Sequence, residues 1–419
     1  RTVGPIREKY RADVLRDEFA PYDISRFAYR GGFRYRRSNI PEDEEVALPA
    51  GSRLYVCGSW SGWSLMEEME RQDDGWYTST FVLGEGRYEL FDLCLDRDPR
   101  LKIYPAVHKA SRKIWVHGPD DGSAGQKWLV EGRDLQVSAG TVFQVHFRWG
   151  VERMEVYWEE ASSASGALAI KYDHRYSLVG DVSKWKCAPM MRVDDEEGTW
   201  EGTVRIGSQG RAEFQLVRDD DLDQVIYPSQ HRASSSFVPA RGPDDMGKGK
   251  HFFVRGHPGE LATVKLVIVD GSVVVTASSE RGVVEWRSRQ GWSRHDYCVV
   301  GTFGNAKPTV MVMDDSTPGR FSCRVRAGTL YFEETGDYGD FFQVVVDGDS
   351  LQAYYPEVGL ADVPGQIVVR RPDGLGSENK FLIRCPEPGT YFDIVFDANA
   401  EDRRRTVSWA PTAQEALQA

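Results

Sequence analysis

The segment Leu54-Tyr55-Val56-Cys57-Gly58 decides the fold, because it recurs twice further along the chain. Its counterparts are Tyr176-Ser177-Leu178-Val179-Gly180 and Tyr297-Cys298-Val299-Val300-Gly301, and the last glycines of the three segments are 122 and 121 residues apart. Recurrence at a nearly constant spacing is the signature of internal repeats. The 419 residues can therefore be treated as copies of one shorter unit.

Two further anchors follow that segment in the same order in every copy. The first is an aromatic segment of the form Phe-x-x-x-x-Asp at residues 91–96, 214–219 and 342–347, and each precedes a Tyr-Pro pair. The second is Gly-Pro-Asp-Asp at 118–121 and 242–245, with Arg-Pro-Asp-Gly at 371–374, and each leads into an apolar triplet. The constant order indicates three homologous units, called repeats 1, 2 and 3 below.

Each repeat has the pattern of a β-sandwich. Alternating runs such as 76–83 and 200–206 are separated by clusters of Gly, Pro and Asp, which indicates strands joined by turns. Units of about 110 residues with turns this frequent suit two packed sheets. We predict an all-β protein of three tandem immunoglobulin-like β-sandwich repeats with a short basic, partly helical N-terminal arm. The expected bounds are 1–48 for the arm and 49–160, 171–280 and 292–411 for the repeats, with a flexible linker at 161–167 and a stiffer, partly buried one at 281–291.

The charge of the chain argues against a nucleic-acid partner. There are 52 Lys and Arg against 64 Asp and Glu, which gives a net charge of -12 and a pI near 5.3. The exception is the arm, whose first 40 residues hold ten basic and five acidic side chains and leave the remainder near -17. A basic arm beside an acidic body predicts protein partners or self-association through the arm.

The cysteines and apolar runs indicate a soluble protein, which we expect to be intracellular and in a reducing compartment. The six cysteines occur without a CxxC pair or a repeated spacing, so neither a zinc site nor a disulfide framework is expected. No apolar run approaches the roughly 20 residues of a membrane span, and no signal-like apolar core is visible at the N-terminus. The first residue is Arg1 rather than Met, which predicts a processed protein or a segment of a longer precursor.

Repeat 1 carries a Trp-rich turn in a recognisable context. Residues 56–63 read Val-Cys-Gly-Ser-Trp-Ser-Gly-Trp, then Gly-Trp-Tyr follows at 75–77 and an aromatic strand ends in Asp at 86–96. This pattern resembles the starch-binding and glycogen-binding β-sandwich modules of amylolytic enzymes and of the AMP-activated kinase β subunit. In that family the turn supplies an aromatic platform on which a sugar ring stacks, so the resemblance implies α-glucan binding through Trp60 and Trp63. Repeat 2 keeps Trp185 in the turn, whereas repeat 3 has Phe303 and Ala306 there.

The remaining aromatic positions of the repeats are predicted to be core residues. Large apolar side chains that recur at one place in an alternating strand are first of all packing residues. Two such sets occur, namely Trp76, Trp200 and Phe321, and Trp128, Phe252 and Phe381. Trp60 and Trp63 differ because they flank Ser-Gly in a turn, where no strand face obliges burial. They form either a ligand surface or a cover folded over the edge of their own sandwich.

The polar residues that recur between repeats favour structural roles. His108 and His231 follow the Tyr-Pro pairs at one spacing, and we expect both to fix loops by hydrogen bonds. The Asp pairs at 120–121 and 244–245 follow Pro and are expected to cap turns. The acidic group at 219–223 lacks the glycine and glutamate of an EF-hand loop. No phosphate loop, GxSxG elbow or HExxH motif occurs, so we predict no catalytic residue, no metal and no cofactor.

Two functions remain open from the sequence. The first is a non-catalytic binding protein whose best ligand is an α-glucan, starch or glycogen, held at Trp60 and Trp63 in repeat 1, with Trp185 as a further candidate. The second is a structural or scaffold subunit of a filament or large complex whose sandwiches have lost sugar binding. The loss of platform residues in two repeats and the aromatic segment around Trp286 and Trp292 favour the second.

Overall fold

A computed structural model describes residue 48 and residues 51–112, 114–134, 136–149, 154–162, 171–181 and 183–413. The regular structure in these ranges consists of strands and of 3-10 helices no longer than four residues, so the prediction of an all-β protein is confirmed. The predicted arm lies outside the described residues apart from Leu48, as do residues 163–167 of the first linker. None of the helices in the described ranges is long and apolar enough to span a membrane.

Repeat 1 consists of two antiparallel sheets that pack face to face around a common core. The first sheet has the order β2 (Met66–Glu68), β1 (Leu54–Gly58), β5 (Tyr88–Leu95), β6 (Lys102–Pro105) and β7 (Val116–Asp120), with β8 (Trp128–Glu131) also paired to β5. The second sheet has the order β10 (Met154–Glu160), β9 (Val142–Trp149), β4 (Tyr77–Val82) and β3 (Glu70–Arg71).

Repeat 2 has the same strand order with one strand added. Its first sheet runs β12 (Ala188–Pro189), β11 (Tyr176–Gly180), β15 (Arg211–Arg218), β16 (Val225–Pro228) and β17 (Ala240–Asp244), with β18 (Phe252–Arg255) on β15. Its second sheet runs β13 (Met191–Arg192), β14 (Thr199–Arg205), β19 (Leu261–Val269), β20 (Ser272–Ser279) and β21 (Gly282–Arg287). The predicted linker at 281–291 therefore contains a sheet strand, and Trp286 on that strand is fully buried instead of lying between repeats.

Repeat 3 has the same basic strand order as repeats 1 and 2. Its first sheet runs β23 (Thr309–Val310), β22 (Tyr297–Gly301), β27 (Asp337–Val346), β28 (Asp349–Pro356) and β30 (Val369–Arg370); β26 (Leu330–Phe332) and β31 (Lys380–Cys385) also pair with β27, and β29 (Leu360–Ala361) lies parallel to β31. The second sheet runs β24 (Val312–Met313), β25 (Arg320–Ala327), β32 (Thr390–Asp397) and β33 (Val407–Pro411).

The sequence anchors pair with each other in space. The glycine that ends the first strand of each repeat lies opposite the phenylalanine of the second anchor, in the pairs Gly58 with Phe91, Gly180 with Phe214 and Gly301 with Phe342. One shared register across three repeats is the structural counterpart of their sequence similarity, because a shift of one residue would turn every side chain to the opposite face.

Each repeat is centred on three aromatic rings that pack together. The sets are Phe91, Trp128 and Trp158; Phe214, Phe252 and Trp286; and Phe342, Phe381 and Trp409. Ring centroids that touch within a set lie between 4.9 and 6.3 Å apart. The prediction that Trp128, Phe252 and Phe381, the first residues of the apolar triplets, fill the cores is confirmed.

The other predicted core set is correct for Trp200 and Phe321 and wrong for Trp76. Trp76 is half-buried on the outer face of repeat 1, edge-on to Tyr157 at 5.0 Å between ring centroids. The next residue, Tyr77, occupies the core position and packs on Phe147. Successive residues of a strand point to opposite faces, so an alignment displaced by one residue exchanges core and surface.

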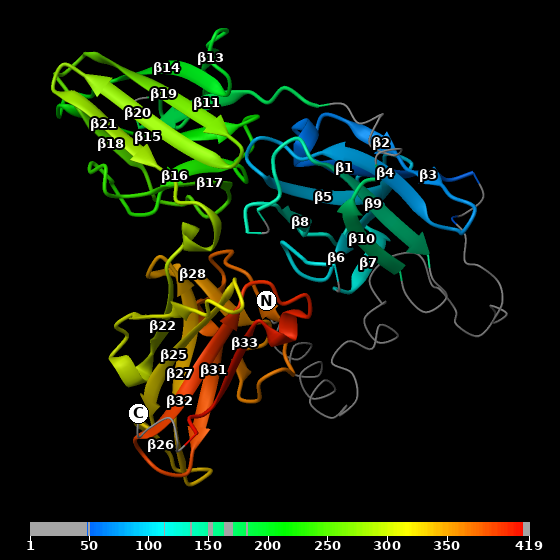
Figure 1. The fold of residues 1–419 in the computed structure, drawn as a ribbon, viewed down its shortest axis with the longest axis vertical. Helices are drawn as coiled ribbons and strands as arrows, with labels where there is room; N and C mark the ends of the chain where they lie inside the picture. Colours follow the sequence, from blue (N-terminus) through cyan, green and yellow to red (C-terminus); the bar gives the residue numbers. More distant parts are fainter. Residues whose placement is uncertain are drawn as a thin grey trace, which may run out of the picture.

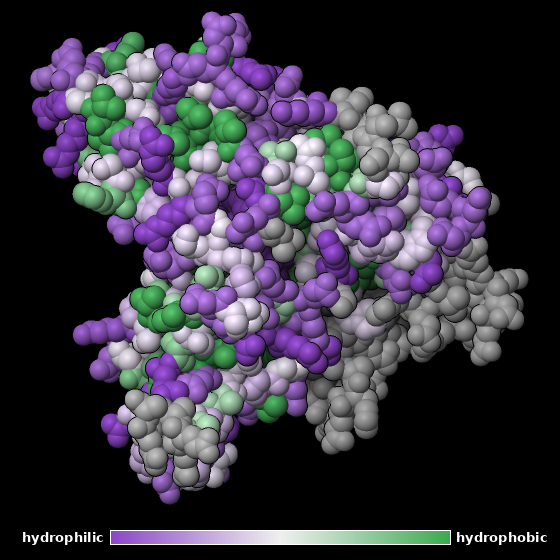
Figure 2. Space-filling model, viewed as in Figure 1, coloured by the Kyte–Doolittle hydropathy of each residue, from purple (hydrophilic) through white to green (hydrophobic). Residues whose placement is uncertain are grey.

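Figure 1 shows the three repeats around a common centre, with repeat 1 in blue to teal, repeat 2 in green to yellow-green and repeat 3 in yellow to red. Each repeat contacts the other two, through side chains described in the next section. The face drawn in Figure 2 is mostly hydrophilic, with small apolar patches among the polar side chains. Scattered apolar residues of this kind are ordinary for a protein surface.

Candidate functional site

The turn after the first glycine has one backbone shape in all three repeats. Trp63, Trp185 and Ala306 stand five residues after that glycine and have φ values of 59°, 60° and 59°. This left-handed conformation is uncommon for residues other than glycine, so its recurrence identifies the three positions as equivalent. The predicted platform residues therefore lie in comparable turns, and what surrounds each side chain decides whether it can meet a ligand.

Trp60 is a core residue. Its side chain is 5% exposed and stacks on Phe81 with ring centroids 3.9 Å apart. The ring also lies against Gly58, where an added Cβ would come within 2.4 Å of the indole, and Phe303 lies against Gly301 in the same way. The expectation that Trp60 offers a ring face to a ligand is therefore not met, because the turn folds this residue back over its own sandwich.

Trp63 is half-buried at the contact between repeats 1 and 2. Its indole Nε1 donates a hydrogen bond to Asp221 of repeat 2 at 2.7 Å. The ammonium group of Lys127 lies 4.3 Å from the ring centroid and pairs with Asp223 at 3.1 Å. The acidic segment at 219–223 is thus used for contacts with repeat 1, and the two positions that repeat 1 was expected to offer to a sugar are both engaged within the chain.

Trp185 is the exposed member of the predicted set. Its side chain is 45% exposed, and its ring centroid lies 4.5 Å from that of His251. Glu213 lies beside them, accepts a hydrogen bond from His251 Nδ1 at 3.1 Å, and forms an ion pair with Arg232 Nε at 2.9 Å. These four side chains, called the Trp185 surface below, all belong to repeat 2.

The equivalent face of repeat 1 carries different side chains, and other repeats cover it. Lys127 directly precedes the core residue Trp128, as His251 precedes Phe252, and Lys109 follows His108 as Arg232 follows His231. Lys109 is 4% exposed and donates to the carbonyl of Pro372 in repeat 3 at 3.1 Å. This face of repeat 1 is therefore a contact face, whereas the equivalent face of repeat 2 leaves Trp185 and Arg232 exposed.

Buried ion pairs join the repeats to one another. Arg218 of repeat 2 makes two hydrogen bonds to Glu89 of repeat 1, at 2.8 and 3.1 Å, and neither side chain is exposed. Arg241 of repeat 2 holds Asp347 of repeat 3 in the same bidentate way, at 2.9 and 3.0 Å. Although burial alone would raise it, His295 and Arg241 hold the pKa of Asp347 well below its usual range. Sequence reasoning missed these pairs; the one visible signal was the position of Glu89 inside a largely apolar strand.

Asp120 and Asp244 cap turns as expected, His231 contacts a nearby loop carbonyl, and His108 lies at the contact between repeats 1 and 2. His108 lies 3.5 Å from Asp245, and His231 contacts the carbonyl of Gly249. Asp120 accepts the backbone amide of Gly122 at 2.7 Å, which is a turn cap. Asp244 accepts the amide of Met246 at 3.0 Å in the same manner. Within the described ranges, no group of three or more His, Cys, Asp or Glu side chains is arranged to hold a metal ion.

Comparison with known proteins gives little further information. No protein-family model matches the sequence, and no curated protein matches it. Among solved structures, SusF from Bacteroides thetaiotaomicron aligns over 85% of this chain and 71% of its own, at 11% identity and a TM-score of 0.19. A likeness at that TM-score carries no argument about the ligand of this chain, for which the geometry of its own surfaces has to be used.

Proposed function

We propose that this chain is a non-catalytic carbohydrate-binding protein that takes an α-glucan, starch or glycogen, at the Trp185 surface of repeat 2. The observation that carries the proposal is a tryptophan ring, 45% exposed, held against His251 in the turn that supplies the platform in the modules that repeat 1 resembles. The apolar C–H face of a pyranose packs on indole, and the proposed site therefore moves from repeat 1 to the repeat whose ring is accessible.

The polar side chains of the Trp185 surface suit the rim of a sugar. Arg232 provides N–H donors on a side chain that is 54% exposed, and Glu213, itself 8% exposed, holds Arg232 and His251 in place. His251 fixes one edge of the ring. A binding site usually combines an apolar face with a few polar groups that fix orientation, and this surface has both.

Replacement of Trp185 by alanine should lower the affinity for soluble glycogen or a maltooligosaccharide by about five- to tenfold, because one ring–sugar contact contributes about 1–1.5 kcal/mol. Titration calorimetry and retardation in glycogen-containing gels measure the effect. Phe237→Ala is the matched control, since Phe237 is an aromatic residue of the same repeat and is 92% exposed. Equal binding by wild type and Trp185→Ala, or no binding by wild type, would exclude the proposed site.

A structural subunit of a filament or larger complex is the second candidate. The bidentate ion pairs between repeats favour it, because paired buried charges fix the relative orientation of the elements that carry them. In this role the three sandwiches act as one rigid block. The two functions are compatible, because the four side chains of the Trp185 surface contact one another and take no part in the ion pairs between repeats.

The rigid block should lose stability at acidic pH, when the carboxylates at the contacts between repeats become protonated. Burial alone would raise the pKa of Asp245, but Lys109 and His108 hold it at about 2. A carboxyl whose folded pKa lies below its unfolded value of about 4 stabilises the fold fully above pH 5 and loses that contribution as the pH falls toward 2. For Asp245 the loss is about 2 kcal/mol, measurable as a falling urea midpoint.

Asp245→Asn should flatten this pH dependence, whereas Asp315→Asn, which changes an exposed carboxyl of repeat 3, should leave it as in wild type. Small-angle scattering at neutral pH adds a direct measure of shape. A chain whose repeats move independently at pH 7, or an Asp245→Asn variant with the wild-type acid profile, would contradict the rigid block.

A further inference from the structure

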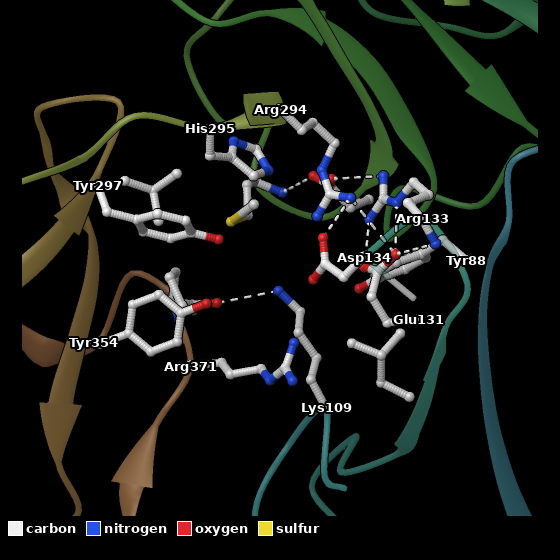
Figure 3. A pocket seen from close by; sticks show the side chains of 15 residues that line it. Tyr88, Lys109, Glu131, Arg133, Asp134, Arg294, His295, Tyr297, Tyr354 and Arg371 are labelled. Atoms are coloured by element: carbon white, nitrogen blue, oxygen red, sulfur yellow. Dashed lines mark hydrogen bonds and ion pairs between the residues drawn. The ribbon is translucent and has the colours of Figure 1, made fainter. Parts of the chain in front are cut away.

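A small polar cavity lies where the three repeats meet, as Figure 3 shows. Its volume is about 30 Å³, which has room for one or two water molecules. Residues of all three repeats line it, among them Tyr88 and Lys109 of repeat 1, Asp244 of repeat 2, and Arg294 and Arg371 of repeat 3.

Most of the charged side chains in the lining have partners. Arg133 pairs with Glu131 at 2.8 Å, and Arg294 pairs with Asp134 at 2.8 Å. Lys109 pairs with Asp245, which lies just outside the lining. Although burial alone would raise it, Arg133 and Arg294 hold the pKa of Glu131 at about 2, so this carboxylate stays ionised at neutral pH.

Two neighbouring arginines of repeat 3 have no such partner. Neither Arg371, in the lining, nor Arg403 beside it makes an ion pair with a carboxylate of the described residues. Arg371 Nε and Arg403 Nη1 are buried and make no hydrogen bond within the part of the chain that the structure describes. Arg403 is 2% exposed, and burial together with the positive charge of Arg371 lowers its pKa to about 9. A buried charge without a partner is costly, so the two side chains call for a counter-charge.

We propose that the cavity binds a small monovalent inorganic anion, represented by chloride, between Arg371, Lys109 and the hydroxyl of Tyr88. The lining holds four cationic side chains against three carboxylates, and the excess stays at one positive charge when Asp245 and Arg403 are included. The Tyr88 hydroxyl supplies a further donor, since it is buried and makes no hydrogen bond to a described residue. The volume suits one monatomic ion and excludes an anion of the size of phosphate.

The anion acts as a link between repeats. Because its ligands come from separate repeats, the site is complete only when the sandwiches are docked. A ligand that binds the docked chain and not the unfolded chain stabilises the docked arrangement in proportion to the logarithm of its concentration. Chloride therefore strengthens the same arrangement that the buried ion pairs hold.

The test compares thermal unfolding of the full chain in sodium chloride and in sodium gluconate at equal ionic strength, because gluconate is too large for the cavity. The midpoint should rise with chloride by on the order of 2 °C for each tenfold increase once the site begins to fill. Arg371→Gln should abolish the difference between the two salts. Arg320→Gln, which changes an exposed arginine of the same repeat, should retain it.

Two further measurements keep the proposal testable if Arg371→Gln fails to fold. Tyr88→Phe should weaken the chloride dependence, and crystals soaked in bromide should show an anomalous peak in the cavity. Equal midpoints of the wild-type chain in the two salts, or a chloride effect that survives in Arg371→Gln, would overturn the proposal. Stabilisation by inorganic phosphate without stabilisation by chloride would overturn it as well.

Discussion

Replacement of Arg218 by methionine should lower the free energy of unfolding by about 3–5 kcal/mol, because it leaves the Glu89 carboxylate buried without its counter-charge. The two side chains form a bidentate pair across the contact between repeats 1 and 2, and both have 0% exposure. Burial opposes the charge on Arg218, yet Glu89 raises the pKa of Arg218 above its usual value, so Arg218 stays charged. Urea unfolding followed by tryptophan fluorescence measures the loss.

Two companion variants separate the charge effect from lost packing. Glu89→Leu combined with Arg218→Met should recover most of the stability, since replacing a whole buried pair with apolar residues is often neutral. Arg192→Met removes an exposed pair with Asp173 and should cost less than about 1 kcal/mol. A loss below about 1 kcal/mol in Arg218→Met would show that the contact does not hold the repeats together in solution.

The sandwiches could be predicted because the same sequence pattern occurs in all three repeats. Glycine and phenylalanine anchors that recur at one spacing pair across the first sheet in all three repeats, as Gly58 with Phe91 shows. Comparison between repeats also identified the central rings Trp128, Phe252 and Phe381. These features are local or repeated, and local patterns determine strands and their inward faces.

The contacts between repeats could not be predicted in the same way. Glu89 and Arg218 are 129 positions apart, and the sequence of their strands does not indicate that these two side chains form an ion pair. Trp76 was misplaced because two aromatic residues stand next to each other and either could face inward. Residues 281–291 look like a linker in the sequence because repeat 2 alone adds strand β21 to the common order. In each case the decisive contact is specific to one repeat.

The turn position of Trp63, Trp185 and Ala306 has a different environment or side chain in each repeat. Trp185 is exposed, Trp63 is bound by the acidic segment of repeat 2, and repeat 3 has Ala306 instead. The backbone shape is retained while the side chain changes its partner. In repeat 1 the turn is covered because repeat 2 packs against it. In repeat 2 the tryptophan of the same turn is exposed, and the proposed sugar site is therefore on repeat 2.

Replacement of Trp60 by alanine should destabilise repeat 1 by about 3–5 kcal/mol and should leave glucan binding by the folded chain unchanged. The ring fills the core between Phe81 and Phe91, and alanine would leave a cavity that the surrounding strands can close only in part. Trp60→Phe should cost less, because repeat 3 already places Phe303 at this position. Trp185→Ala should change stability by less than about 0.5 kcal/mol while it lowers glucan affinity, as expected for a surface residue. Trp60→Ala should thus lower stability without changing glucan affinity, and Trp185→Ala should lower glucan affinity without changing stability. A stable Trp60→Ala chain that has lost glucan binding would instead place the sugar site on repeat 1.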